Sequence, residues 1–187
     1  MVAAVIGAIL LGLILLAVIT VISIYNSLIQ IRVSVKNAWS QIDVQLKRRH
    51  DLIPNLVNVA KGYMAHERQT LEAVIKARQQ AIDASSLKDK VQAENFLSQT
   101  LRSLFAVTEN YPNLKADQQM KQLQEELVST ENKIAFARQF YNDETGRYNS
   151  SIQIFPNNIV AGTFNFQAQE FFEIQDAAEK QAPQVSF

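Results

Sequence analysis

An uninterrupted apolar run from Val2 to Ile24 constrains this chain more than any other feature of its sequence. Its only polar side chains are those of Thr20 and Ser23, and the first charged side chain is that of Arg32. As a helix rising ~1.5 Å per residue, the run is about 34 Å long, which is enough to cross the ~30 Å hydrocarbon core of a bilayer. The sequence therefore predicts a membrane-spanning helix.

A cleaved signal peptide is the alternative interpretation of this run. Signal peptides have a basic N-terminal region, a shorter apolar stretch and a cleavage site of small residues. Here no basic residue precedes the run, and Ile22–Tyr25 contains no such cleavage site, so we expect a retained anchor. Arg32 and Lys36 follow the run, and positively charged flanks stay in the cytoplasm. We therefore expect the N-terminus outside and the body of the protein in the cytoplasm.

Three small residues in the run repeat at intervals of four: Ala4, Ala8 and Gly12. Such a stripe lets two helix backbones approach closely in lipid. The simpler explanation is that alanine and glycine are common in membrane helices. Self-association through this stripe is therefore a hypothesis that the sequence raises.

Composition indicates that the rest of the chain is one all-α domain. Five glycines and four prolines among 187 residues are few, which argues against most all-β folds. Lysine plus arginine number 18, as do the acids, and this balance argues against a nucleic-acid partner. The absence of cysteine excludes a disulfide framework, an iron–sulfur site and a thiol nucleophile.

Apolar residues after the run recur at alternating intervals of four and three, the pattern of a seam between helices. They are Ile24, Leu28, Ile31, Val35, Ala38 and Ile42. The anchor should therefore continue without a break into the first helix of the body, to about His50. We expect a turn at 47–54, where Asp51 could cap a new helix with Pro54 in its first turn. A single kinked helix is the alternative.

Three further helices are predicted over about 51–84, 88–110 and 115–154, with breaks at Ser85–Ser86 and Pro112. Four helices with short connections pack up-down-up-down. This alternation puts the segment after Ile154 at the membrane-proximal end and the basic residues Arg48 and Arg49 at the far tip. We divide the chain into a transmembrane anchor (1–24), an antiparallel four-helix bundle (25–154) and a Phe-rich C-terminal segment (155–187) with a short helix.

The sequence offers little sign of catalysis. Its isolated glycines do not form a GxGxxG, P-loop or GxSxG motif. His66–Glu67 begins like the HExxH zinc motif, but Thr70 stands where the second histidine is needed. We therefore expect a protein that is not an enzyme, with no catalytic residues, cofactor or metal.

One group of polar and aromatic side chains is a candidate interaction site. On the fourth helix it comprises Glu131, Arg138, Tyr141, Asn142, Tyr148 and Asn149, and Trp39 and Asp43 on the first helix are expected to face it. The two Tyr-Asn pairs are seven residues apart, so they share one helix face. The group is either a satisfied polar network that sets the register of the bundle or a surface for a partner.

The second candidate is the Phe-rich C-terminal segment. It contains six of the ten phenylalanines, Phe155, Phe164, Phe166, Phe171, Phe172 and Phe187, and Pro156 follows the first of them. Its charged side chains, from Glu170 onward, are mostly acidic, and an anionic cytoplasmic leaflet would repel them. We therefore expect the segment to dock on protein. It would either cap the end of its own bundle or pack against a neighbouring subunit.

Taken together, these residues resemble the LemA family. The resemblance is carried by VKNAWSQIDVQLKRRHDLIPNLV at 35–57, by ENKIAFAR at 131–138, by Tyr-Asn at 141–142 and 148–149, and by FPNN at 155–158. The family pattern usually has a glycine and a proline in its C-terminal phenylalanine block. In this chain Asn165 and Ala168 stand near those places.

The resemblance implies a single-pass protein of the bacterial inner membrane with a cytoplasmic antiparallel four-helix bundle, and it implies no catalytic residues. A magnetosome-associated relative suggests a role in membrane organisation, and family members are associated with membrane proteases. Two functions follow: a non-enzymatic scaffold that self-assembles and organises or remodels the membrane, or a signalling or protease-adaptor bundle. The expected partners are the lipid bilayer, further copies of the chain and other membrane proteins, but no nucleic acid.

Overall fold

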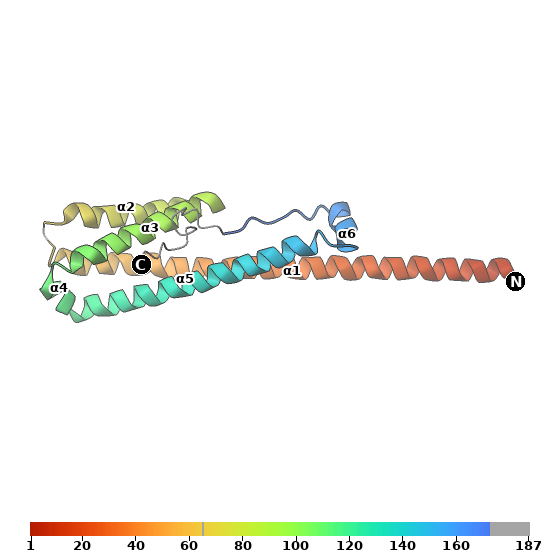
Figure 1. Cartoon of the computed structure of the whole chain (residues 1–187), viewed down its shortest axis with the longest axis horizontal. Coiled ribbons are helices and arrows are strands. Elements are labelled where there is room, and N and C mark those ends of the chain that lie inside the picture. The colour runs from red at the N-terminus through yellow and green to blue at the C-terminus, as the bar shows by residue number, and fades with distance from the viewer. Residues whose placement is uncertain (65, 173–187) are drawn as a thin grey trace, which may run out of the picture. The chain divides into compact units, whose positions relative to one another are not determined.

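The computed structural model describes residues 1–64 and 66–172 (Figure 1). Over these residues the chain forms helices and no strand, which confirms the predicted all-α class. The helices are α1 (Val2–Lys61), α2 (Arg68–Asp83), α3 (Leu87–Thr108), α4 (Pro112–Ala116), α5 (Gln118–Ser151) and α6 (Asn157–Thr163). They divide into two compact units. The anchor unit comprises Met1–Gln41 and Ala137–Phe171, and the bundle unit comprises Ile42–Phe136 with Phe172.

The bundle unit is a four-helix bundle whose helices alternate in direction (Figure 1). Residues 42–61 of α1, helices α2 and α3, and residues 118–136 of α5 each turn one apolar face inward. The core includes Ile53, Leu56, Leu71, Val74, Ala77, Leu97, Leu101, Leu104, Met120 and Leu127. This packing supplies the stability that a single amphipathic helix lacks in water.

The predicted turn at 47–54 is wrong, because α1 runs through Pro54 to Lys61 as one helix. The chain instead turns between Lys61 and Arg68. A proline inside a helix destabilises the helix by about 3 kcal/mol. Burial of each large apolar side chain on the continued helix contributes about 1.5–3 kcal/mol to stability. Ile53, Leu56 and Ala60 are all buried on this extension. The basic residues at 47–50 therefore lie along the bundle and not at its tip.

The other helix boundaries follow local capping chemistry. Ser86 accepts a hydrogen bond from the backbone N–H of Asp89 at 3.0 Å, which starts α3 and confirms the predicted turn there. Pro112 is the first residue of the short helix α4, where its missing N–H costs little. Asp117 then accepts from the backbone N–H of Met120 at 2.9 Å and caps α5. The predicted fourth helix therefore begins at 118 and ends at Ser151.

The anchor unit contains the first part of α1, the last part of α5, and α6. In the part of the chain that the structure describes, α1 is the one helix long and apolar enough to cross a membrane. Beyond the apolar run, the predicted seam is confirmed, since Leu28, Val35 and Ala38 are buried. Residues 137–151 of α5 run beside α1 in the opposite direction (Figure 1), and their own buried side chains include Tyr141 and Tyr148.

Helix α6 lies next to the part of α1 that follows the apolar run. The ring of Phe164, which ends α6, is 4.9 Å from the ring of Tyr25. This contact places the segment after Ile154 beside the residues that directly follow the apolar run of α1.

Candidate functional site

A buried charge cluster occupies the middle of the bundle unit. Arg49 has no exposed surface and forms an ion pair with Glu94, which is equally buried. Its Nη1 donates to Glu131 Oε2 at 2.6 Å and to Ser98 Oγ at 2.8 Å. Ser98 in turn donates to Glu131 Oε1 at 3.0 Å, and His50 Nε2 lies 3.0 Å from Glu94 Oε1. The cluster thus links α1, α3 and α5.

Helix periodicity explains why these charges are buried. Arg49 continues the seam of α1, between the buried residues Leu46 and Ile53. Glu94 occupies the equivalent place in α3, three residues after Val91 and three before Leu97. Both charges therefore point inward, and each finds its counter-charge on the other helix. Of these two residues, only Arg49 is predicted from the sequence, although an acid at a seam position is a signal that could identify Glu94.

The cluster keeps Glu94 ionised. Burial raises the pKa of its carboxyl, but the neighbouring His50 ring and the Arg49 guanidinium outweigh burial and hold the pKa below the ordinary value. One arginine therefore faces two carboxylates, and the guanidinium charge is already compensated. Such a network fixes the register of the helices, because any slip would leave a buried charge without its partner.

A cavity of about 210 Å³ opens beside the cluster. Arg49, Ser98 and Glu131 line its polar side, and Leu101, Phe105 and Leu127 line its apolar side. Within residues 1–64 and 66–172, no group of three or more histidine, aspartate or glutamate side chains could hold a metal ion.

Other predicted site residues in the bundle unit lie at its surface or edge. Asp43 pairs with Lys90 at 3.0 Å, and the half-exposed Arg48 lies 3.7 Å from Glu126. Glu131, predicted as part of the polar group on the fourth helix, bonds Arg49 and Ser98 as described above. Arg138 itself is half-buried and belongs to the anchor unit.

A second site lies in the anchor unit, where α5 holds residues 164–171, here named the tail segment. The Asn149 side chain makes two bonds to one residue of this segment. Its Nδ2 donates to the Gln169 carbonyl oxygen at 2.9 Å, and its Oδ1 accepts from the Gln169 N–H at 2.8 Å. Tyr141 Oη donates to the Glu170 carbonyl oxygen at 2.8 Å. All three bonds reach the backbone, so they hold the segment largely independently of its side chains.

Tyr141 is well suited to donate this bond. Burial is the main cause that raises the pKa of its hydroxyl, and it outweighs the nearby Thr145 side chain, which lowers the pKa. The phenol therefore stays protonated. Trp39 supports it from α1, with ring centroids 5.4 Å apart in an edge-on arrangement. The predicted pairing of these two helix faces is thus present, and Asn142, also predicted, is half-buried on the same helix.

Aromatic contacts hold the other end of the tail segment. The ring of Phe166 is 5.6 Å from that of Tyr25, and the Arg32 guanidinium carbon lies 5.2 Å from the centre of the Phe166 ring. Asn165 has a φ of 55°, a left-handed conformation that asparagine adopts more readily than most residues. An asparagine therefore suits this position.

The phenylalanines of the C-terminal segment fall into two groups. Phe166 and Phe172 are buried, as expected for residues that cap their own protein. Phe155, Phe164 and Phe171 are exposed, and Pro156 follows Phe155 through a cis peptide bond. Phe187 lies outside the described residues. The small residues Ala4, Ala8 and Gly12 are exposed on the apolar part of α1.

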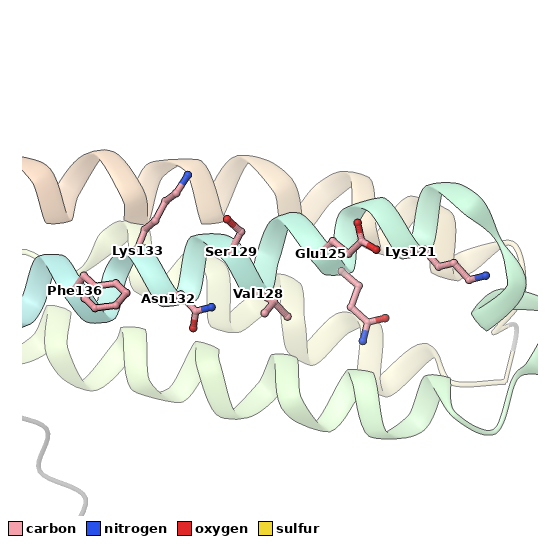
Figure 2. A pocket seen from close by; sticks show the side chains of 8 residues that line it. Lys121, Glu125, Val128, Ser129, Asn132, Lys133 and Phe136 are labelled. Carbon is pink, nitrogen blue, oxygen red and sulfur yellow. The ribbon is translucent and has the colours of Figure 1, made fainter.

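The outer face of α5 in the bundle unit is open (Figure 2). A groove of about 680 Å³ runs along it, and every residue that lines the groove comes from this one helix. They are Lys121, Gln124, Glu125, Val128, Ser129, Asn132, Lys133 and Phe136. Most are polar, but Val128 and Phe136 are exposed apolar side chains.

These features define a helical protein in which one helix carries both an apolar stretch long enough to cross a membrane and one of the four helical segments of a bundle. Residues 38–187 match the model of the LemA family, and the chain belongs to that family. The resemblance seen in the sequence is therefore confirmed.

Several characterised proteins are similar to this chain. Magnetosome protein MamQ 2 of Paramagnetospirillum magneticum is 24% identical, over 86% of this chain and 68% of its own length. Magnetosome protein MamQ of Magnetospirillum gryphiswaldense is 23% identical over the same shares. Protein LemA of Metamycoplasma hominis is 25% identical, over 81% of this chain and 69% of its own length.

Proposed function

We propose that this protein is a non-enzymatic scaffold, anchored by α1 in the bacterial inner membrane, that self-assembles and organises or remodels that membrane. One observation carries the proposal: α1 is a single helix of 60 residues that joins the apolar run to the bundle. A bundle built on its own anchor is held close to the bilayer. The names of the magnetosome relatives are in keeping with a role at a membrane.

The proposed orientation places the N-terminus outside and the bundle in the cytoplasm. Arg32 and Lys36, both exposed on α1 after the apolar run, support it through the preference of cations for the cytoplasmic side. A reporter enzyme that works only in the cytoplasm, fused after Phe187, should be active. Activity of a reporter that works only outside the cytoplasm would contradict the orientation.

Self-assembly through α1 would use the stripe of Ala4, Ala8 and Gly12. The stripe is exposed, and a β-carbon built at Gly12 would meet no atom within 4 Å, so a second helix has room to approach. The chain contains no cysteine, so single cysteines can be introduced cleanly. Ala8→Cys should cross-link to a dimer on oxidation in membranes, whereas Leu10→Cys, on the other side of the helix, should cross-link much less. Equal cross-linking at both positions would contradict this interface.

A signalling or protease-adaptor bundle is the second candidate function. The exposed apolar side chains Val128 and Phe136 on the open face of α5 favour it, because exposed apolar groups in a polar groove suit a protein partner. The mass of the protein in mild detergent, measured by light scattering, separates the two functions. A large discrete oligomer supports the scaffold, and a monomer or dimer supports the adaptor.

A further inference from the structure

Helix α6 and the turn before it carry an apolar surface that the described part of the chain leaves uncovered. Four large side chains are at least half exposed: Ile154 at 56%, Phe155 at 78%, Ile159 at 60% and Phe164 at 50%. Within α6, Val160 and Ala161 are buried, whereas the neighbouring Ile159 is exposed. The segment is therefore amphipathic, with one face on the protein and an apolar face turned outward.

This surface lies beside the point where α1 leaves its apolar run. The run ends at Ile24, and the rings of Phe164 and Tyr25 are 4.9 Å apart. Figure 1 shows α6 next to α1 in this region. Tyrosine side chains are enriched at the level of the lipid headgroups, where an apolar ring and a polar hydroxyl are both accommodated. If α1 spans a bilayer, the contact between Phe164 and Tyr25 places α6 at the headgroup level of one leaflet.

The charge pattern of this surface suits lipid. No charged side chain occurs between Arg147 and Glu170, so the surface can enter a bilayer interface without burying a charge. The acidic residues that led us to expect repulsion from an anionic leaflet begin only at Glu170. On α1, the exposed cations Arg32 and Lys36 follow about 12 Å or more beyond Ile24, where they can reach lipid phosphates.

We propose that residues 152–164 form a second membrane contact, in which Ile154, Phe155, Ile159 and Phe164 enter the headgroup–acyl boundary of the leaflet from which α1 emerges. Amphipathic surfaces of this kind insert about 5–10 Å. Because the contact inserts beside the anchor in one leaflet only, it expands that leaflet and couples the protein to membrane curvature. The inference rests on the anchoring part of the proposed function and is independent of self-assembly.

Nitroxide labels in the full-length protein test the contact. Single cysteines replace Phe155, Leu13 in the apolar run, and Phe136 on α5, and the labelled proteins are reconstituted in vesicles of phosphatidylcholine and phosphatidylglycerol. Phe136 is the matched control, because its exposure of 72% is close to that of Phe155, yet it lies about 22 Å along α5 from Ser151. Collisions with oxygen, which concentrates in acyl chains, are compared with collisions with a nickel chelate, which stays in water.

The label at Phe155 should report a shallow position, about 5–10 Å below the phosphates, while Leu13 reports a deep position and Phe136 reports water. A label at Ile159 should repeat the result for Phe155. If the Phe155 and Phe136 labels are equally exposed to the nickel chelate while Leu13 remains deep, the anchor stands and this inference is wrong. Low collision rates with both reagents at Phe155 would also overturn it, since they indicate cover by a second copy of the chain. A Leu13 label in water would refute the anchor as well.

Discussion

Arg78 donates its Nε hydrogen to the carbonyl oxygen of His50 at 2.7 Å. This carbonyl is the one that Pro54, four residues later in α1, cannot bond, because proline has no N–H. A side chain from α2 thus replaces the missing bond of the α1 helix. The relationship explains how α1 passes through Pro54 without losing a buried hydrogen bond.

Replacing Arg78 by methionine should destabilise the bundle by about 1–3 kcal/mol, since the His50 carbonyl loses its donor. The cost should be smaller when Pro54 is also replaced by alanine, because the new backbone N–H bonds the same carbonyl. Urea unfolding of the four variants in detergent, followed by circular dichroism, measures this coupling. Arg68→Met, an exposed arginine on the same helix, is the control and should have little effect. If Arg78→Met lowers the free energy of unfolding equally with and without Pro54, Arg78 does not compensate for the missing proline N–H.

Neighbouring arginines of α1 should differ sharply in their importance. Arg49→Met leaves the buried Glu94 carboxylate without its main counter-charge and should cost about 3–5 kcal/mol. Arg48→Met removes only a half-exposed arginine 3.7 Å from Glu126 and should cost about 1 kcal/mol or less. The unfolding free energies of the two variants, measured side by side, check this. Similar costs for both would mean that the cluster contributes no more than a surface pair.

Acid should weaken the cluster through Glu94. The pKa of this carboxyl is lower in the folded chain than its ordinary value of 4.5, so the unfolded chain binds the proton more readily. The stability it contributes is therefore fully present above about pH 4.5 and is lost as the pH falls through the folded-state pKa. The difference in unfolding free energy between wild type and Glu94→Gln should shrink as the pH falls from neutral to below 4.5. Glu126→Gln, at the surface, serves as the control, and a difference that stays constant with pH would show that ionisation of Glu94 is not involved.

The tail segment should loosen when Asn149 is replaced. Asn149→Ala removes both bonds to the Gln169 backbone, and a loss of about 1.4 kcal/mol in local stability corresponds to tenfold faster amide exchange. Hydrogen exchange read by mass spectrometry should show this increase in peptides that contain Gln169. The exposed Asn132 on the same helix offers a matched control, and Asn132→Ala should leave these peptides unchanged. Unaltered exchange in Asn149→Ala would show that the Tyr141 bond to Glu170 and the phenylalanine contacts hold the segment without Asn149.

Much of the fold could be predicted because helix formation leaves a local signature. The apolar run from Val2 to Ile24 and the four-three spacing beyond it determine which faces are buried, and Leu28, Val35 and Ala38 are indeed buried. The same spacing continues through Leu46, Arg49, Ile53 and Leu56 and favours the unbroken α1 that the structure has, whereas Pro54 favours a turn. The proline was misleading because its cost is local, whereas its compensation by Arg78 comes from another helix.

The candidate sites were predicted only in part, for the same reason. The sequence by itself determined the membrane-spanning length, the helical class and the Tyr-Asn pairs that share a face of α5. Only the tertiary structure decided that Glu94 faces Arg49 and that Asn149 binds the backbone of Gln169. Periodicity shows which side chains point inward, because it depends on neighbours within one helix. The partner of each side chain depends on how distant segments pack, and no spacing within a single segment records that.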